Sequence, residues 1–243
     1  MNIARPFILK TFMVTVMLVL AVSVLYSQSK IHYSDRSRRV TKKITPALEK
    51  EFGAQDIDLG SKVFIRIFKE EHILELWVQK GEEYVLFKEY PVAYYSGGLG
   101  TKTKYGDQKS PEGFYTVYPH SLNPYSSYHL SFNIGYPNAY ERYRGYTGNY
   151  IMIHGNEVSI GCYAMTDPVI EEIYVIVQQS FEKGEKSFPV HIFPFKMTAE
   201  NLEKHKKNVN MPFWKELYEG FCAFEEQHIP PDIKVVKGRY TIA

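Results

Sequence analysis

The sequence is poor in cysteine and almost without net charge. Its 243 residues include two cysteines, and the formal net charge is +2. Two cysteines exclude a disulfide-built scaffold and a four-cysteine zinc site, and the small charge argues against a dedicated nucleic-acid binder. With 44% hydrophobic and 23% charged residues, wholesale disorder is excluded as well. The length suffices for one large domain or two small ones, each with a core.

Acidic residues are missing altogether from positions 1–29, which carry Arg5 and Lys10. The remainder is formally neutral, because it holds 27 basic and 27 acidic residues. Residues 11–26 lack any charge, and two basic residues, an apolar stretch and a polar Ser-Gln-Ser are typical of a secretory signal. The stretch is slightly short for a membrane helix. We expect residues 1–29 to be a signal peptide or an inner-membrane anchor over 6–26, and the remainder to be exported.

Residues 30–45 carry six basic residues against one acid. This composition predicts a solvated arm, and we interpret residues 30–59 as a basic linker. An alternative is a tether that lies near anionic lipid headgroups.

The pattern from residue 60 onward predicts a mainly β domain. Alternation of apolar and polar residues predicts strands over 62–68, 74–78, 84–92, 114–118, 130–134, 149–154 and 190–193, the first three forming consecutive antiparallel hairpins. A long glycine-rich loop over 96–113 interrupts them, and long loops in compact domains are often functional. Helical spacing begins at Asp167 and ends before Gly184. Two further helices, over 198–207 and 212–228, predict a C-terminal helical extension (198–243) that packs on a catalytic domain (60–197).

One short segment carries chemistry. His154 ends a predicted strand, and Cys162 follows eight residues later in a polar turn before a predicted helix. A helix N-terminus or an imidazolium lowers the pKa of a thiol, and the thiolate is the nucleophile. His154 is then base and acid, and backbone N–H groups at and before Cys162 are candidates for an oxyanion hole. From this chemistry alone, a catalytic Cys162–His154 pair and a structural loop thiol are equally favoured interpretations.

The segment I-H-G-N-E-V-S-I-G-C-Y-A-M-T-D at 153–167 resembles the catalytic signature of the YkuD-type L,D-transpeptidase family, and more closely its YafK-like branch of murein enzymes. Similar stretches occur at 103–115, 122–138 and 193–198, so the resemblance covers roughly residues 60–200. It implies a β-rich domain in which a cysteine attacks the carbonyl at the L-centre of meso-diaminopimelate in a peptidoglycan stem peptide. An acyl-enzyme then passes to an amine or to water, without a metal or another cofactor.

The resemblance also implies roles for individual residues. Cys162 is the nucleophile, His154 is the base, and the carbonyl of Gly155 orients that histidine. Ser159, Ile160 and Gly161 shape the nucleophile turn, although Ser159 reads equally as a plain turn hydroxyl. His129, Asn156, Tyr163 and Arg144 are candidates for substrate binding, and His129 reads equally as a satisfied loop histidine.

One departure from the family pattern bears on the reaction. Typical transpeptidases follow the cysteine with an aliphatic residue and an arginine, a bidentate carboxylate clamp; here Tyr163 and Ala164 follow Cys162. The YafK-like branch shares this departure and is associated with hydrolysing the link between diaminopimelate and the murein lipoprotein. Arg142 or Arg144 is a candidate for the role of the missing arginine. The default interpretation is that both are surface charges. Transpeptidation, or a non-catalytic peptidoglycan-binding module, remains open.

The remaining candidates are weaker. Asp107 and Lys109 lie in the long loop and either order it over the cleft or touch substrate, with a solvated turn as the default interpretation. His120 and His191 lack metal-ligand spacing. Cys222 lies in an amphipathic helix, and we expect a core thiol that forms no disulfide with Cys162.

Overall fold

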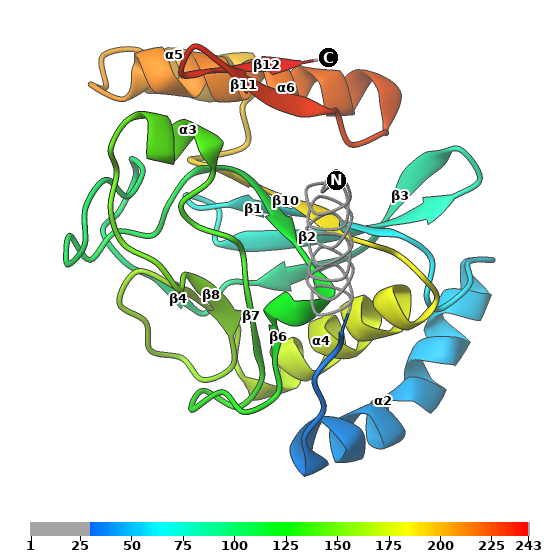
Figure 1. Ribbon diagram of the computed structural model, residues 1–243. Coiled ribbons are helices and arrows are strands. Elements are labelled where there is room, and N and C mark those ends of the chain that lie inside the picture. Colours follow the sequence, from blue (N-terminus) through cyan, green and yellow to red (C-terminus); the bar gives the residue numbers. More distant parts are fainter. Residues whose placement is uncertain (1–29, 243) are drawn as a thin grey trace, which may run out of the picture.

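The structure is a computed structural model that describes residues 30–242. The predicted export segment, residues 1–29, lies outside the described residues. Within residues 30–242, none of the helices combines the length and hydropathy needed to span a bilayer. The protein is rich in β-structure, as the sequence predicts, with helices on both sides of the sheets (Figure 1).

A five-stranded mixed sheet forms the centre of the protein. Its strands lie in the order β3 (Glu83–Pro91), β2 (Ile73–Lys80), β1 (Val63–Phe68), β10 (Phe188–Phe193) and β5 (Gly113–Val117). The antiparallel β1–β2–β3 hairpins confirm the sequence prediction, whereas β10 pairs with β1 in parallel. A parallel partner requires a long crossover, and the entire candidate site lies within it.

Strand β1 is buried on both faces, and its alternating side chains separate two cores. Val63, Ile65 and Ile67 point to the main core, which they share with helix α4 (Asp167–Glu182). Phe64 and Phe68 point to the opposite face, where the C-terminal helix covers them. The predicted periodicity of α4 is therefore confirmed, and the helix begins at Asp167 as expected, with Thr166 as its N-cap.

A second sheet lies beside the main core and carries the candidate site. Its order is β4 (Tyr94–Tyr95), β9 (Tyr163–Ala164), β8 (Met152–His154), β7 (Ser131–Asn133) and β6 (Leu122–Asn123). Between β5 and β8 the chain forms a 3-10 turn (Pro119–Ser121) and helix α3 (Ala139–Tyr143). Buried Phe132 and Ile153 join this sheet to the main core.

The prediction of a solvated linker over residues 30–59 is wrong, because Asp35–Ala54 forms helix α2. Ser34 caps its N-terminus, its Oγ accepting from the N–H of Ser37. Val40, Leu48 and Phe52 are buried against α4, beside which α2 lies (Figure 1). The apolar residues 40, 44, 48 and 52 recur every four positions and form a stripe along one face of the helix. The many charged residues between them dominate the composition, which therefore does not reveal the helix.

The C-terminal extension covers the opposite face of the main sheet (Figure 1). Helices α5 (Ala199–Lys204) and α6 (Met211–Gln227) confirm the two predicted helices. The extension is not wholly helical, because β11 (Ile233–Val236) and β12 (Arg239–Ile242) form a hairpin. Lys237 and Gly238 form its turn with positive φ values of 50° and 73°.

Candidate active site

The pairing of β8 with β9 brings His154 and Cys162 to one face of the second sheet. The strands are parallel, with Ile153 opposite Tyr163, so Cys162 aligns with Met152, and the N–H of Met152 lies 3.3 Å from the Cys162 Sγ. Side chains two residues apart in a strand share a face. The eight-residue spacing therefore places His154 and Cys162 on one face of adjacent strands, with the sulfur at the level of Met152.

A backbone carbonyl fixes the orientation and tautomer of His154. Its Nδ1 lies 2.5 Å from the carbonyl oxygen of Gly155. A carbonyl only accepts, so Nδ1 carries the proton and Nε2 keeps a free lone pair. His154 is 2% exposed, and the Tyr128 ring lies 4.8 Å from the imidazole between centroids. Burial lowers the pKa of His154 and the Gly155 bond opposes this, leaving the pKa below its ordinary value.

The thiol is held in its neutral form, contrary to the expectation of a thiol acidified by a helix. Burial raises the pKa of Cys162, against the opposing effects of the Met152 N–H and the Lys102 charge. Helix α4 begins only at Asp167, beyond strand β9, so its N-terminus does not adjoin the sulfur. The raised pKa of Cys162 and the lowered pKa of His154 favour a neutral thiol and a neutral imidazole at rest. The bond from Nδ1 to Gly155 leaves Nε2 as the basic nitrogen of that imidazole.

Serine hydroxyls occupy the backbone N–H groups at the nucleophile turn. The N–H of Gly161 donates to Ser96 Oγ at 2.7 Å, and that of Cys162 to Ser159 Oγ at 2.9 Å. Gly161 has a φ of +92°, which only glycine adopts readily, and Ile160 is 78% exposed. An oxyanion at either N–H must displace a hydroxyl.

The glycine-rich loop over residues 96–112 is ordered against this turn. Ser110 Oγ donates to the Cys162 carbonyl at 3.0 Å. Asp107 accepts from three loop N–H groups and pairs with Lys102 at 2.6 Å. These interactions outweigh burial and lower the pKa of Asp107 to about 2. Asp107 thus orders the loop, which is one of the roles predicted for it, rather than forming a solvated turn.

The four predicted substrate contacts fall in different places. His129 Nε2 lies 2.8 Å from Glu171 Oε1, as a satisfied loop histidine would. Asn156 is exposed, and its N–H donates to Asp167. Tyr163 is fully buried, with its hydroxyl on the Pro111 carbonyl, and so presents no surface to a substrate.

Arg144 does not replace the missing arginine either. Its guanidinium donates to the carbonyl of Gly238 in the C-terminal hairpin at 3.2 Å and stacks over Tyr140. These contacts direct it away from the β8–β9 face. Arg142 donates to the Pro137 carbonyl and lines the groove described next.

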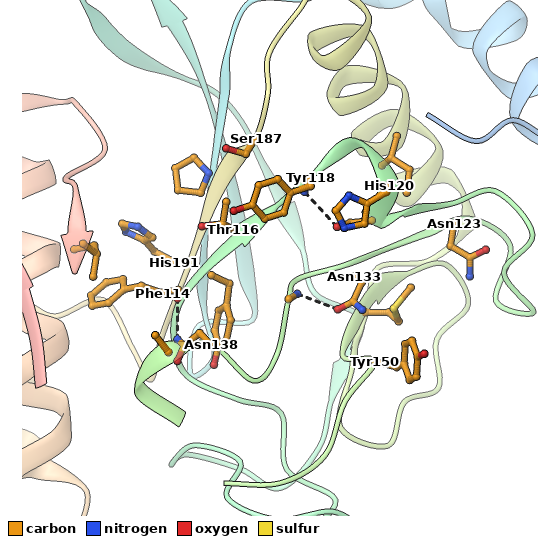
Figure 2. Close-up of a pocket in the computed structure, with 18 of the residues that line it drawn as sticks. Phe114, Thr116, Tyr118, His120, Asn123, Asn133, Asn138, Tyr150, Ser187 and His191 are labelled. Atoms are coloured by element: carbon orange, nitrogen blue, oxygen red, sulfur yellow. Dashed lines mark hydrogen bonds between the residues drawn. The ribbon is translucent and has the colours of Figure 1, made fainter. Parts of the chain in front are cut away.

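A groove of about 1020 Å³ runs between the C-terminal hairpin and β8 (Figure 2). It includes Tyr150 and Met152, whose backbone O and N atoms contact the Cys162 sulfur. Tyr150 is 71% exposed and, like Tyr128, was not predicted for the site. Tyr128 lies within the similar stretch 122–138, and Tyr150 lies shortly before the stretch 153–167. In the sequence, only His129, His154 and Cys162 of these stretches carry a chemical signal, and an isolated tyrosine does not.

Among the described residues, no three His, Cys, Asp or Glu side chains cluster as metal ligands do. His191 is buried among Phe64, Phe114 and Phe193, and burial lowers its pKa to about 3. Cys222 and Cys162 are both free thiols. Cys222 is partly exposed on α6, and so it is not the fully buried core residue that we expected.

The β-rich domain and the turn that carries His154 and Cys162 together point to one class of protein. Residues 62–192 match the L,D-transpeptidase catalytic domain family (YkuD), and the chain belongs to that family of peptidoglycan-related enzymes. It is 48% identical over 199 residues to "Putative L,D-transpeptidase YafK" of Escherichia coli K12, covering 82% of this chain and 80% of that protein.

The solved structures to which the chain is similar share far less sequence with it. The helical cell shape determining protein Pgp2 from Campylobacter jejuni is 19% identical, with a TM-score of 0.44 over 72% of this chain and 73% of that one. Bd1075 of Bdellovibrio bacteriovorus is 22% identical, with a TM-score of 0.38 over 64% and 56% of the chains.

Proposed function

We propose that the chain is an exported, periplasmic enzyme of peptidoglycan remodelling with Cys162 as its nucleophile and His154 as its base. Its substrate is a stem peptide, attacked at the carbonyl of the diaminopimelate L-centre. The reaction that we favour is hydrolysis of the amide between diaminopimelate and the murein lipoprotein. Family membership and the 48% identical relative support the class of enzyme.

The observation that carries the proposal is the orientation of His154. Its Nδ1–H is bound to the Gly155 carbonyl, so the free Nε2 lone pair belongs to the same imidazole that shares a face with Cys162. A base needs this arrangement in order to take the thiol proton. A buried histidine kept for packing would also bind its N–H to an acceptor, so the support comes from the position of the Nε2 lone pair on the face shared with Cys162.

The proton and bond changes balance through these two side chains. His154 Nε2 takes the thiol proton as the sulfur attacks the carbonyl carbon, and the imidazolium returns that proton to the leaving amine as the C–N bond breaks. In the second step, water gives a proton to Nε2 while its oxygen attacks the thioester. The proton then returns to the sulfur as the C–S bond breaks, releasing a carboxylic acid and the thiol.

Transpeptidation shares the first step and differs only in the acceptor. An amine from a second stem peptide, or from the lipoprotein, then takes the place of water. Hydrolysis is favoured because the turn lacks an arginine after Cys162 and because Arg144 is engaged at the C-terminal hairpin. Arg142 lines the groove near the sulfur, but its guanidinium is bound to the Pro137 carbonyl, so neither candidate arginine takes the place that follows the cysteine in typical transpeptidases.

The deciding experiment incubates the purified chain with lipoprotein-linked muropeptides. We expect release of the tripeptide stem and of free lipoprotein, and loss of both products in Cys162→Ala. Cys222→Ala is the matched control, because it removes the other thiol and should retain full activity. New diaminopimelate–diaminopimelate cross-links indicate the transpeptidase instead, and full activity of Cys162→Ala contradicts both reactions.

A non-catalytic peptidoglycan-binding module is the second candidate. The exposed tyrosines of the groove, such as Tyr118 and Tyr150, favour binding of a peptidoglycan fragment. Thiol alkylation separates the two candidates. Because burial raises the pKa of Cys162 in either case, the informative comparison is the alkylation rate with and without His154. A rate that falls in His154→Gln supports the enzyme, and a rate that this substitution leaves unchanged supports the module.

A further inference from the structure

Four hydrogen bonds tie the start of the chain's described part to residues 124–130, which we term the wall loop. Ser34 Oγ donates to the Pro124 carbonyl at 2.8 Å, and the Tyr125 hydroxyl donates to the Tyr33 carbonyl at 2.7 Å. Arg36 supplies the other two bonds, since its Nη1 donates to two wall-loop carbonyls. These are the carbonyls of Ser126, at 2.9 Å, and His129, at 2.5 Å.

The wall loop in turn packs on the candidate base. The ring of Tyr128 lies against the imidazole of His154, with 4.8 Å between centroids. A Cβ added at Gly155 would lie 3.0 Å from the Cβ of His129, so the loop also meets the residue whose carbonyl orients His154. The loop therefore closes one side of the base.

The loop backbone needs this support. His129 has a φ of +65°, a left-handed conformation that persists in non-glycine residues only where surrounding contacts hold it. Glu171 holds its imidazole from α4, and Arg36 holds its carbonyl from α2. Arg36 bridges two carbonyls three residues apart, one on each side of Tyr128, so it fixes the segment that presents that ring.

We infer that Arg36 is a positioning residue for His154: through the wall loop it seats Tyr128 on the imidazole and keeps the base dry. Arg36 touches neither the sulfur nor the reacting carbonyl. The role rests on the proposed function for its catalytic meaning, whereas the effect on His154 is measurable without any substrate.

The effect has a definite sign. Burial is the larger cause acting on the pKa of His154, and it lowers that pKa. The ionisable groups on the elements packed around β8 include Tyr128 and His129 on the wall loop, Cys162 and Tyr163 beside β8, and Asp167 and Glu171 on α4. None of them changes in Arg36→Ala; releasing the wall loop admits water to the imidazole, so its pKa rises toward the ordinary value near 6.5.

The test is a titration of the His154 imidazole by NMR in the full chain, with the resonance assigned by its loss in His154→Gln. We expect Arg36→Ala to raise the pKa by roughly half a unit to one unit and to move the acid midpoint of Cys162 alkylation by the same amount. Arg39→Ala is the matched control, because Arg39 is exposed on the same helical turn and its substitution removes the same charge. It should change neither the His154 pKa nor the midpoint of Cys162 alkylation.

Further variants trace the path. Tyr128→Ala should give the shift of Arg36→Ala, and the double variant should add nothing beyond either one. Tyr128→Phe keeps the ring, so the His154 pKa should equal that of the parent protein. Arg36→Lys keeps one donor, so its His154 pKa should lie between those of the parent and of Arg36→Ala. A folded Arg36→Ala with an unchanged His154 pKa overturns the inference; if that variant does not fold, an unchanged pKa in Tyr128→Ala does so. A shift together with a fully active Cys162→Ala refutes the proposed function and leaves the positioning role standing.

Discussion

Helix α2 and the C-terminal extension both lie outside the family-matched residues 62–192, yet they support the site in different ways. From α2, Arg36 holds the wall loop, on the His154 side, through hydrogen bonds to backbone carbonyls. From α6, Trp214 holds the glycine-rich loop, on the Cys162 side, through a buried charge. The hydrogen bonds of Arg36 are partly exposed, whereas the hydrogen bond of Trp214 is fully buried.

The buried charge on the C-terminal side is Glu112. It pairs with Lys69 at 3.0 Å, and both side chains are fully buried. The indole N–H of Trp214 and the N–H of Gly100 donate to its two oxygens. A buried ion pair is costly unless every hydrogen bond is made, so this loop depends on α6 for stability, whereas the wall loop depends on α2 for placement. The comparison predicts large losses of stability on the C-terminal side and effects on the imidazole on the N-terminal side.

The largest effect is expected for Trp214→Ala. The variant removes a fully buried indole and leaves a Glu112 oxygen without its donor, for a loss of about 5 kcal/mol in the free energy of unfolding. Chemical denaturation measures it. Val209→Ala, at a position that is 89% exposed, is the control and should change little. A loss below about 1 kcal/mol would show that the C-terminal extension is dispensable for the fold.

Phe52→Ala tests the N-terminal side of the comparison. Phe52 is 1% exposed and packs on Phe87 in a tilted arrangement, with 4.2 Å between ring centroids. We expect a loss of about 3–4 kcal/mol in the same denaturation experiment. The exposed Lys42→Ala on the same helix should be neutral. If Phe52→Ala is also neutral, α2 is the loosely attached arm that composition predicts, and the comparison fails.

The smallest effect is expected for Lys43→Ala. Lys43 pairs with Glu171 at 3.4 Å, but the lysine side chain is 75% exposed, so the loss should stay below about 0.5 kcal/mol. Thermal unfolding of this variant beside Lys50→Ala measures it. Because Glu171 also binds His129, a His154 pKa that moves in Lys43→Ala would place the control of the wall loop at Glu171 rather than at Arg36.

Much of the central architecture was predictable from local pattern. Alternation over 62–68 predicts β1 because every second side chain enters one core, and helical spacing from Ile170 to Val177 predicts α4. Residues 40, 44, 48 and 52 form a comparable stripe in α2, but the surrounding charges dominate the composition. The hairpin at the C-terminus was missed although Lys-Gly is a turn signal, because its strands are only four residues long.

The sequence by itself determined the candidate pair. His154 at a strand end and Cys162 after Gly161 are local features, because a strand, a turn and a glycine conformation depend on neighbouring residues. Tertiary structure alone decided what surrounds the pair: the neutral thiol, the occupied N–H groups of the turn, Tyr128 on the imidazole and Arg36 behind it. These depend on burial and on contacts as much as 93 residues apart in the chain, and desolvation and packing of that kind leave no periodic signal in a sequence.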